Sequence, residues 1–352
     1  MKHFLDSDIA EVAKNLGPAA QAFSGKTVLM TGARGFLGRH FTAVFDYLNQ
    51  HVLEKPCNFV GVDNLISAGK AGADEVERPN MRFIKHDVIQ PLEWEGPLDY
   101  VIQAAGIASP YYYRAYPLET LEVAITGTRN MLELANRHHA RFTFFSSSEI
   151  YGDPDAKHVP TPESYRGSVS CRGPRACYDE SKRVGETLCY IFHESHGTAT
   201  TAIRPFNVYG PGMQEADYRV LPNFASCIKG GRPLNLYGTG VQTRTFCYIT
   251  DALTGFLLTI IRGVPGEVYN IGNPTPEVSM MDLVKSIEKV MAKPVKYNVI
   301  EYPDSYPADE PMRRCPDIRK ARLQLDFQPI VSLEEGLRRF FTWTDQNFTG
   351  QQ

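Results

Sequence analysis

The chain has 352 residues, of which 43% are hydrophobic and 22% are charged, and its formal net charge is -3. This composition is ordinary for a globular protein with one large or two modest cores, and it offers no basic field suited to a nucleic-acid backbone. No apolar run approaches the roughly 20 residues that a membrane-spanning helix needs.

The first 24 residues mix acidic and apolar side chains and lack the charged-then-apolar order of a secretory signal. We therefore expect an N-terminal helical extension over 1–24, a surface helix that precedes the first strand. Seven cysteines, an odd number without a CxxC pair, argue against a disulfide framework or a zinc site. They favour a reducing compartment, so we predict a cytoplasmic protein without a metal.

Short apolar runs alternate with helical patterns from residue 25 to about residue 205. We expect strands at 26–30, 58–62, 82–85, 99–104, 141–146 and 200–204, and helices at 38–48, 118–138 and 177–196. Strands that alternate with helices imply a parallel sheet covered on both faces. The predicted fold class is therefore α/β, with a Rossmann-type doubly wound parallel sheet.

The texture of the sequence changes after residue 205, where proline and glycine become denser and segments shorten. Short strands are expected at 235–237, 245–248 and 267–270, and helices at 280–291 and 333–343. We predict a sheet domain at 25–205, with later strand contributions, and a smaller C-terminal α/β domain at 206–352 that closes over a substrate.

Three glycines, Gly32, Gly35 and Gly38, follow the first expected strand and open the first helix. In this pattern the first glycine permits a tight turn and the second lets the backbone approach a pyrophosphate. The third lets helix and strand pack closely. The phosphates would lie at the positive end of the helix, so the spacing predicts a dinucleotide site.

Asp63 ends the second expected strand. A carboxylate there accepts both ribose hydroxyls and repels a 2′-phosphate, so it predicts NAD rather than NADP. A turn or cap is the alternative, because Asp63-Asn64 is also good turn chemistry. Arg34, inside the glycine loop, would instead favour a 2′-phosphate. Asp87-Val88, after the third strand, should meet the adenine.

Tyr178 and Lys182 form a YxxxK pair at the start of a long expected helix. Residues four apart lie on one helical face, so both can point at one substrate atom. A tyrosine with a pKa near 10 is a poor base at neutral pH. A neighbouring ammonium and a nicotinamide cation lower that pKa, so the phenolate can take a proton from a sugar hydroxyl.

Several longer motifs carry a resemblance to a known family. Segment 147–154 (SSEIYGDP) resembles TSEVYGDP, and 173–186 (GPRACYDESKRVGE) is similar to GPRSCYDEGKRVAE. Further matches are Ala108-Ser109-Pro110 with Tyr113, and the segments 206–211, 242–248 and 316–318. Over most of its length the chain resembles the extended short-chain dehydrogenases that act on sugar nucleotides, above all the UDP-glucuronate decarboxylases.

The resemblance implies NAD as cofactor and UDP-glucuronate, a UDP-sugar, as substrate. The sugar would be oxidised at C4, lose CO2 as a β-keto acid and be reduced again to UDP-xylose. Catalytic positions would be Ser147, Ser148, Glu149, Tyr178 and Lys182. Besides Tyr178 and Lys182, the cofactor would contact Gly32, Gly35, Phe36, Leu37, Gly38, Asp63, Asn64, Ser67, Asp87, Val88, Ala104 and Ala105. The substrate would contact Tyr113, Glu149, Asn207, Arg219, Tyr237, Arg244 and Arg314.

By the same resemblance, Ser147 would hydrogen-bond the C4 oxygen, and Ser148 and Glu149 would position the ring or relay the C5 proton. The serine-rich strand end has a plainer reading as a helix cap. Arg244 and Arg314 suit phosphate and carboxylate, because the guanidinium fork gives two parallel hydrogen bonds. Either arginine could instead be a solvated surface charge.

Neighbouring families remain as alternatives. The 4,6-dehydratases carry an acid where this chain has Ser148, and the 4-epimerases generally lack Glu149. A non-catalytic NAD-sensing protein is the remaining alternative, and the Tyr178–Lys182 pair argues against it. The two long helices resemble a pair that forms a four-helix dimer interface, which implies a homodimer.

The chain departs from the decarboxylase pattern at a few positions, which leaves open another uronate substrate or release of the 4-keto sugar. Ala124 replaces an asparagine that orients the active-site lysine, and Gly212 replaces an arginine. Arg166, Ser168 and the segment 170–172 replace Trp, Asn and NPI. Their arginines would add contacts to an anionic substrate or lie on the surface.

Overall fold

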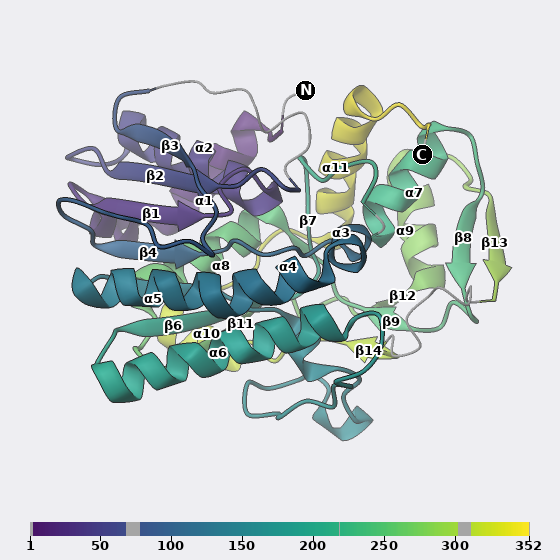
Figure 1. Ribbon diagram of the computed structural model, residues 1–352. Coiled ribbons are helices and arrows are strands. Elements are labelled where there is room, and N and C mark those ends of the chain that lie inside the picture. The colour runs from purple at the N-terminus through teal and green to yellow at the C-terminus, as the bar shows by residue number, and fades with distance from the viewer. Residues whose placement is uncertain (1–2, 68–77, 218, 302–310, 352) are drawn as a thin grey trace.

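The computed structural model describes residues 3–67, 78–217, 219–301 and 311–351. Seven parallel strands form its central sheet in the order β11-β6-β5-β4-β1-β2-β3 (Figure 1). In chain order they are Thr27–Thr31 (β1), Asn58–Asp63 (β2), Met81–Lys85 (β3), Tyr100–Gln103 (β4), Arg141–Phe145 (β5), Thr200–Pro205 (β6) and Val268–Ile271 (β11). The predicted doubly wound α/β fold is confirmed.

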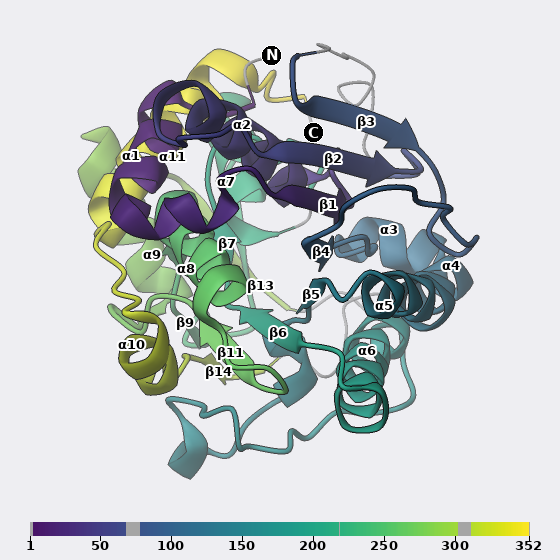
Figure 2. The ribbon, with the colours of Figure 1, turned by 90° about the vertical axis from the view of Figure 1, so that its left-hand side faces the viewer.

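Helices cover both faces of the sheet, as Figure 2 shows along its edge. One face packs against α2 (Phe36–His51) and α8 (Ile249–Arg262), the other against α5 (Thr128–Arg137) and α6 (Ala176–His196). With both faces covered, β1 is buried along its whole length. This explains why its sequence reads as a continuous apolar run rather than an alternating one.

Two expected elements differ in detail from the structure. The helix expected at 118–138 consists of α4 (Pro117–Glu122), a π-helical turn, η3 (Val123–Gly127), and then α5. Only the second half of the strand expected at 245–248 forms a strand, β10 (Cys247–Tyr248), and a separate short strand, β9 (Thr243–Arg244), lies just before the expected range. Helix α8 was not predicted. Its side chains are buried on all sides from Ile249 to Ile260, including the polar Thr250, Asp251, Thr254 and Thr259.

The N-terminal extension forms α1 (Asp6–Leu16) and a 3-10 helix, η1 (Gly17–Phe23). It was expected as a surface helix, but α1 packs against α2 and α8 and buries Ile9, Val12 and Leu16. Its Asp8 is also buried and accepts hydrogen bonds from Tyr248 Oη (2.7 Å) and Arg339 Nη1 (3.0 Å). The extension therefore belongs to the main core.

Smaller elements from the second half of the chain gather beside the sheet. Short strand pairs and triplets are formed by β7 (Val208–Tyr209) with β10, β8 (Leu234–Tyr237) with β13 (Tyr297–Ile300), and β9 with β12 (Val278–Ser279) and β14 (Arg313–Arg314). The remaining helices are α3 (Pro110–Ala115), η4 (Ser148–Tyr151), η5 (Ala156–His158), α7 (Val220–Lys229), α9 (Met280–Met291), α10 (Arg319–Leu325) and α11 (Leu333–Asn347). Within the described residues, no helix is both long and apolar enough to cross a membrane.

Candidate active site

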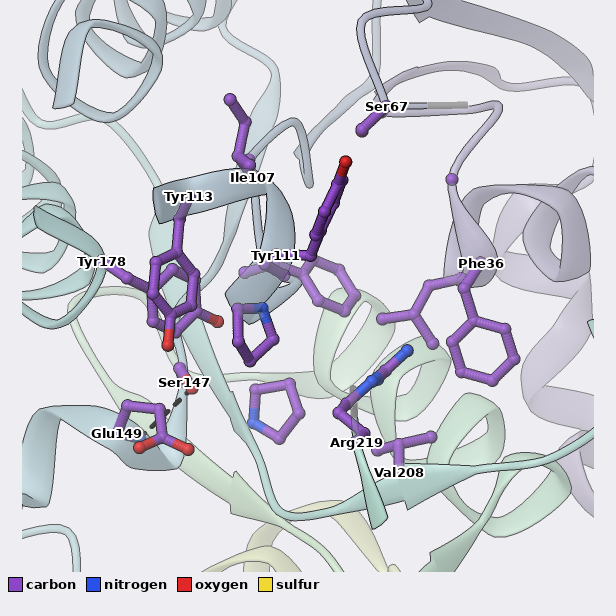
Figure 3. A pocket seen from close by; sticks show the side chains of 18 of the residues that line it. Phe36, Ser67, Ile107, Tyr111, Tyr113, Ser147, Glu149, Tyr178, Val208 and Arg219 are labelled. Carbon is purple, nitrogen blue, oxygen red and sulfur yellow. Dashed lines mark hydrogen bonds between the residues drawn. The ribbon is translucent and has the colours of Figure 1, made fainter. Parts of the chain in front are cut away.

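A cavity of about 870 Å³ lies where the strands β1, β2, β4 and β5 end. Its walls come from the loops after these strands, from the start of α6 and from the smaller elements beside the sheet. Figure 3 shows Tyr113, Tyr178, Ser147 and Glu149 on one side of it, and Phe36 and Arg219 on the other. Every catalytic, cofactor and substrate residue named from the sequence lines this cavity.

The glycine loop has the close backbone packing that a dinucleotide site requires. Gly32 adopts a φ of +69°, and a Cβ atom there would lie 2.8 Å from the carbonyl oxygen of Ala104. A Cβ at Gly38 would lie 2.2 Å from the oxygen of Gly32. Gly35 directly precedes α2, whose N-terminus faces the cavity. The loop thus brings bare backbone and a helix dipole to one place, which fits the pyrophosphate of NAD.

Asp63 is fixed at the end of β2. Its carboxylate accepts hydrogen bonds from the backbone N–H groups of Arg34 (2.9 Å) and Leu65 (2.7 Å). The turn role considered from the sequence is therefore present, while the side chain also lines the cavity. The Arg34 guanidinium lies over the ring of Phe83, 4.2 Å from its centre.

A second pair of polar side chains follows β2 and β3. Asn64 Nδ2 donates to Asp87 Oδ2 at 2.9 Å, and the backbone N–H of Ile89 donates to Asp87 Oδ1. These bonds orient the loop next to Val88, at the end of the cavity expected to receive the adenine.

Tyr178 and Lys182 are both buried in the first turns of α6. Burial raises the pKa of Tyr178 to about 12, although the hydrogen bond with Ser147 favours the phenolate. Burial lowers the pKa of Lys182 to about 8. Its ammonium donates to the carbonyl oxygen of Phe145 (2.9 Å) and lies 5.6 Å from the centre of the Tyr178 ring. The ammonium is thus placed to stabilise a phenolate at Tyr178.

The ring of Tyr113 stacks on that of Tyr178, with centres 5.3 Å apart and planes inclined by 15° (Figure 3). Tyr113 comes from α3 and is itself buried. The stack shields one face of the catalytic ring and fixes its direction into the cavity.

Glu149 lies in η4, directly beyond β5, where its backbone N–H bonds to Ser147 Oγ (3.2 Å). Both terminal nitrogens of Arg314 donate hydrogen bonds to the Glu149 carboxylate, with an Nη2–Oε2 distance of 2.7 Å. Arg175 donates to the same oxygen, Oε2. Burial raises the pKa of Glu149, but these guanidinium groups outweigh it and hold the pKa below its usual value. Glu149 is therefore a clamped carboxylate beside Ser147 and Tyr178.

Other residues predicted for the substrate reach the cavity from the elements beside the sheet. Asn207 has a φ of 41° and donates to the Thr245 carbonyl oxygen at 2.8 Å. Arg244 is buried in β9 and donates to the carbonyl oxygen of Thr243. Arg219 pairs with Asp217 and lies 5.7 Å from the centre of the Phe36 ring. It therefore borders the predicted cofactor residues as well as the substrate residues.

Sequence reasoning missed two charged side chains at this site, Arg175 and Asp179. Arg175 lines the cavity and bonds to Glu149, and its Nε lies 3.4 Å from Asp179 Oδ2. Both lie in the motif GPRACYDESK, so the motif itself was the available signal. Without a fold, however, neither could be told from surface charges on a helix.

Some of the positions that depart from the decarboxylase pattern are exposed, and others are buried. Arg166 and Arg172 are exposed, so the structure favours their reading as surface substitutions. Gly212 has a φ of +91°, and a Cβ there would lie 2.4 Å from the carbonyl oxygen of His3. The N-terminal segment thus takes up the space that a side chain at 212 would need. Ala124 is buried in the π-helical turn η3.

A buried polar network supports the catalytic strand end from behind. Glu186 accepts two hydrogen bonds from Arg204, at 2.8 and 2.6 Å, and one from Ser146. Arg204 also bonds to Tyr151 Oη at 2.6 Å. The network ties β5, β6, α6 and η4 together, so the residues on either side of Ser147 are rigidly placed.

These features define an NAD-dependent enzyme of the short-chain dehydrogenase type. The family model "NAD dependent epimerase/dehydratase family" matches residues 28–272, and the chain belongs to this family. UDP-glucuronic acid decarboxylase 5 of Arabidopsis thaliana is 38% identical over 89% of this chain and 88% of its own length. UDP-glucuronic acid decarboxylase 1 of Xenopus tropicalis is also 38% identical, over 89% of this chain and 71% of its own.

Solved structures agree with this assignment. An epimerase from Methanothermobacter thermautotrophicus superposes with a TM-score of 0.77 at 28% identity, over 94% of this chain and 95% of that one. A UDP-glucuronic acid 4-epimerase mutant from Bacillus cereus, solved with a fluorinated UDP-glucuronic acid and NAD, gives 0.75 at 25% identity. That match covers 92% of this chain and 100% of the other.

Proposed function

We propose that this protein is an NAD-dependent decarboxylase that converts UDP-glucuronate to UDP-xylose through a 4-keto intermediate. The observation that carries the proposal is the clamped Glu149 beside Ser147 and Tyr178, with Arg314 and Arg175 on its carboxylate. It joins a base for a sugar hydroxyl to a carboxylate that is held in place to relay a proton to C5. The curated relatives support the same reaction, since they are UDP-glucuronic acid decarboxylases.

The glycine loop, Asp63 and Asp87 would hold NAD, with Ala104 and Ala105 beside its pyrophosphate. Bound there, NAD supplies the oxidation at C4 and the later reduction, without net consumption. Asp63 would accept the ribose hydroxyls with the oxygen lone pairs that its two backbone hydrogen bonds leave available.

Tyr178 takes the proton of the C4 hydroxyl as its phenolate, which the Lys182 ammonium stabilises. Ser147 donates a hydrogen bond to the C4 oxygen and so favours the carbonyl. The bond between C5 and the carboxyl carbon then breaks, and its electron pair is held as an enolate across C5, C4 and the C4 oxygen. Glu149 relays a proton to C5, with Ser148 beside it, before Tyr178 returns its own proton to the C4 oxygen.

Arg244 and Arg314, together with Asn207, Arg219 and Tyr237, would receive the diphosphate and the UDP nucleoside. Ser148 is buried and carries only a hydroxyl, a poor acid for expelling a sugar hydroxyl, which argues against 4,6-dehydration. Tyr113 would close the sugar pocket over Tyr178.

We further propose a cytoplasmic homodimer built on α4, η3 and α6. Large apolar side chains on these elements are exposed in one chain, namely Leu118, Ile125, Tyr190 and Ile191. In both Figure 1 and Figure 2 the helices α4, α5 and α6 lie side by side on one face. A second copy would cover this face. All seven cysteines are free thiols, which fits a reducing compartment.

The decisive experiment incubates the protein with UDP-glucuronate and NAD, and follows CO2 release together with the product by mass and proton NMR. We expect CO2 and UDP-xylose without net NADH. Accumulation of NADH together with a 4-keto pentose would show that the product leaves before the final reduction, and absence of CO2 would contradict the proposal.

Tyr178→Phe should lower turnover by at least about 100-fold. Tyr297→Phe, the same change on the exposed strand β13, should not change it.

A further inference from the structure

Asp179 is a buried carboxylate that the mechanism above does not use. It follows Tyr178 directly in α6 and is 7% exposed. Among the described residues, its Oδ1 atom has no hydrogen-bond partner, while Oδ2 faces Arg175 Nε at 3.4 Å. Burying a carboxylate with one oxygen unsatisfied is costly, which suggests that the group is retained for a reason other than stability.

Asp179 is the outer end of a row of alternating charges that runs into the cavity. Arg175, one helical turn earlier, faces Asp179 and bonds to Glu149, which Arg314 clamps from β14. Arg244 from β9 adds a third positive charge near Glu149. Arg175 is the N-cap of α6, and Tyr178 and Asp179 lie in its first turn, so the start of this helix positions the catalytic ring and the clamp together.

We propose that Asp179, acting through Arg175, is a positioning residue that makes Glu149 able to return a proton to C5. The inference rests on the proposed decarboxylation and concerns its second half. Once the C5–carboxyl bond has broken, C5 holds the electron pair and needs a proton. Glu149 must carry that proton and then recover one from water.

Two arginines on one carboxylate oppose this task, because they favour the ionised form of Glu149. Asp179 competes for Arg175 and draws part of its positive charge away from Glu149. Burial raises the pKa of Asp179 to about 6, against the opposing pull of Arg175. The charged and titratable groups that interact with Asp179 or Arg175 are Glu149 from η4, Arg314 from β14, Tyr113 from α3 and, on α6 itself, the catalytic Tyr178. Asp179 also opposes ionisation of Tyr178, so the loss of its charge should favour the phenolate and should not slow the oxidation step.

The test compares Asp179→Asn with Glu180→Gln, the same type of change at the next residue, whose side chain is 40% exposed and pairs with Arg183. Single-turnover reactions with UDP-glucuronate follow absorbance at 340 nm, CO2, and deuterium entry at C5 from D2O. We expect Asp179→Asn to keep the rate of the first absorbance rise within about twofold and to slow deuterium entry about tenfold. Released 4-keto pentose should increase, and the acid limb of the kcat–pH profile should move.

If Asp179 had a purely structural role, Asp179→Asn would lower the melting temperature and would slow the absorbance rise and deuterium entry equally. We instead expect an unchanged or higher melting temperature, because the substitution removes a buried carboxylate with one unsatisfied oxygen. Equal deuterium entry in Asp179→Asn and wild type would overturn the proposal. If Asp179→Asn does not fold, Arg175→Lys replaces it, because lysine keeps the positive charge but cannot bond to Glu149 and Asp179 with a planar guanidinium. This variant must then slow deuterium entry more than the first absorbance rise. Equal slowing of the two would also overturn the inference. Absence of CO2 from the wild type would instead count against the proposed function.

Discussion

At the scale of single residues, the site is defined by ionisable groups whose pKa values are shifted by burial. The ammonium of Lys182 and the phenol of Tyr178 are both penalised in their charged forms. Such groups cost stability in exchange for reactivity. The cost is therefore measurable on the protein alone, without cofactor or substrate.

Lys182 makes the stability of the protein depend on pH in a defined direction. Its pKa is about 8 in the folded protein and 10.5 as the unperturbed reference value. Below pH 8 both states hold the proton. Between the two values the unfolded chain binds more protons, so the free energy of unfolding rises with pH, by at most about 1.4 kcal/mol per pH unit.

Denaturant unfolding of wild type and Lys182→Met at pH 7 and pH 9 isolates this contribution, since other titrating groups cancel in the difference. We expect the difference in free energy of unfolding to shift by about 1 kcal/mol in favour of the wild type at pH 9. A difference that stays constant between the two pH values would mean that the Lys182 ammonium is not penalised by burial.

At the scale of elements, the sequence predicts those features that local chemistry fixes. The strands end where apolar runs end, and their polar ends carry Asp63, Asp87 and Ser147. Because parallel strands end at one edge, these side chains had to meet in one cavity. Arg175 and Asp179 escaped prediction, because only the packing of α6 against η4 turns two helix charges into part of the site.

Helix α8 and the π-helical turn η3 escaped for different reasons. Helix α8 has apolar residues at helical spacing, Ile249, Leu253, Phe256 and Ile260, so the sequence carried a signal for it that was not used. In η3, Gly127 packs against Val88, where a Cβ would lie 2.7 Å from Val88 Cγ2. That tertiary contact, which no local pattern reports, coincides with the bulge.

The glycine loop gives a matched pair of substitutions within one element. In Gly38→Ala, the new Cβ meets the Gly32 oxygen at 2.2 Å and the Ala33 backbone at 2.6 Å. We expect a loss of roughly 1–3 kcal/mol in stability from this overpacking. In Gly35→Ala the nearest atom is the Gly32 oxygen at 3.3 Å, and Gly35 has a φ of -72°, so stability without NAD should hardly change.

Gly35→Ala should nevertheless weaken NAD binding about tenfold or more, because its backbone is the part that approaches the pyrophosphate. Thermal unfolding without NAD and calorimetric titration with NAD separate the two effects. Wild-type affinity in Gly35→Ala would show that the pyrophosphate does not lie against this residue.

At the scale of the whole molecule, segments far apart in the sequence pack together to complete the core of the half that is expected to bind the cofactor. Asp8 of α1 meets Arg339 of α11, and His3 lies against Gly212 beside α2. The sequence suggested a surface helix here, since amphipathic periodicity shows which face is buried but not which partner covers it. In contrast, the exposed face of α4, η3 and α6 has no partner within the described parts of the chain.

The proposed homodimer makes a prediction for that face. Tyr190 is 62% exposed in one chain, and a two-fold interface would bury it in both copies, so each substitution there acts twice. Tyr190→Glu places two carboxylates in an apolar contact, where an unpaired charge costs several kcal/mol. Since the chain mass is 39.5 kDa, light scattering should report twice that mass for the wild type and one chain mass for the variant.

The control Tyr297→Glu, on the exposed strand β13, should keep the wild-type mass. A wild type of one chain mass would remove the dimer proposal, and a Tyr190→Glu protein of unchanged mass would move the interface to another face.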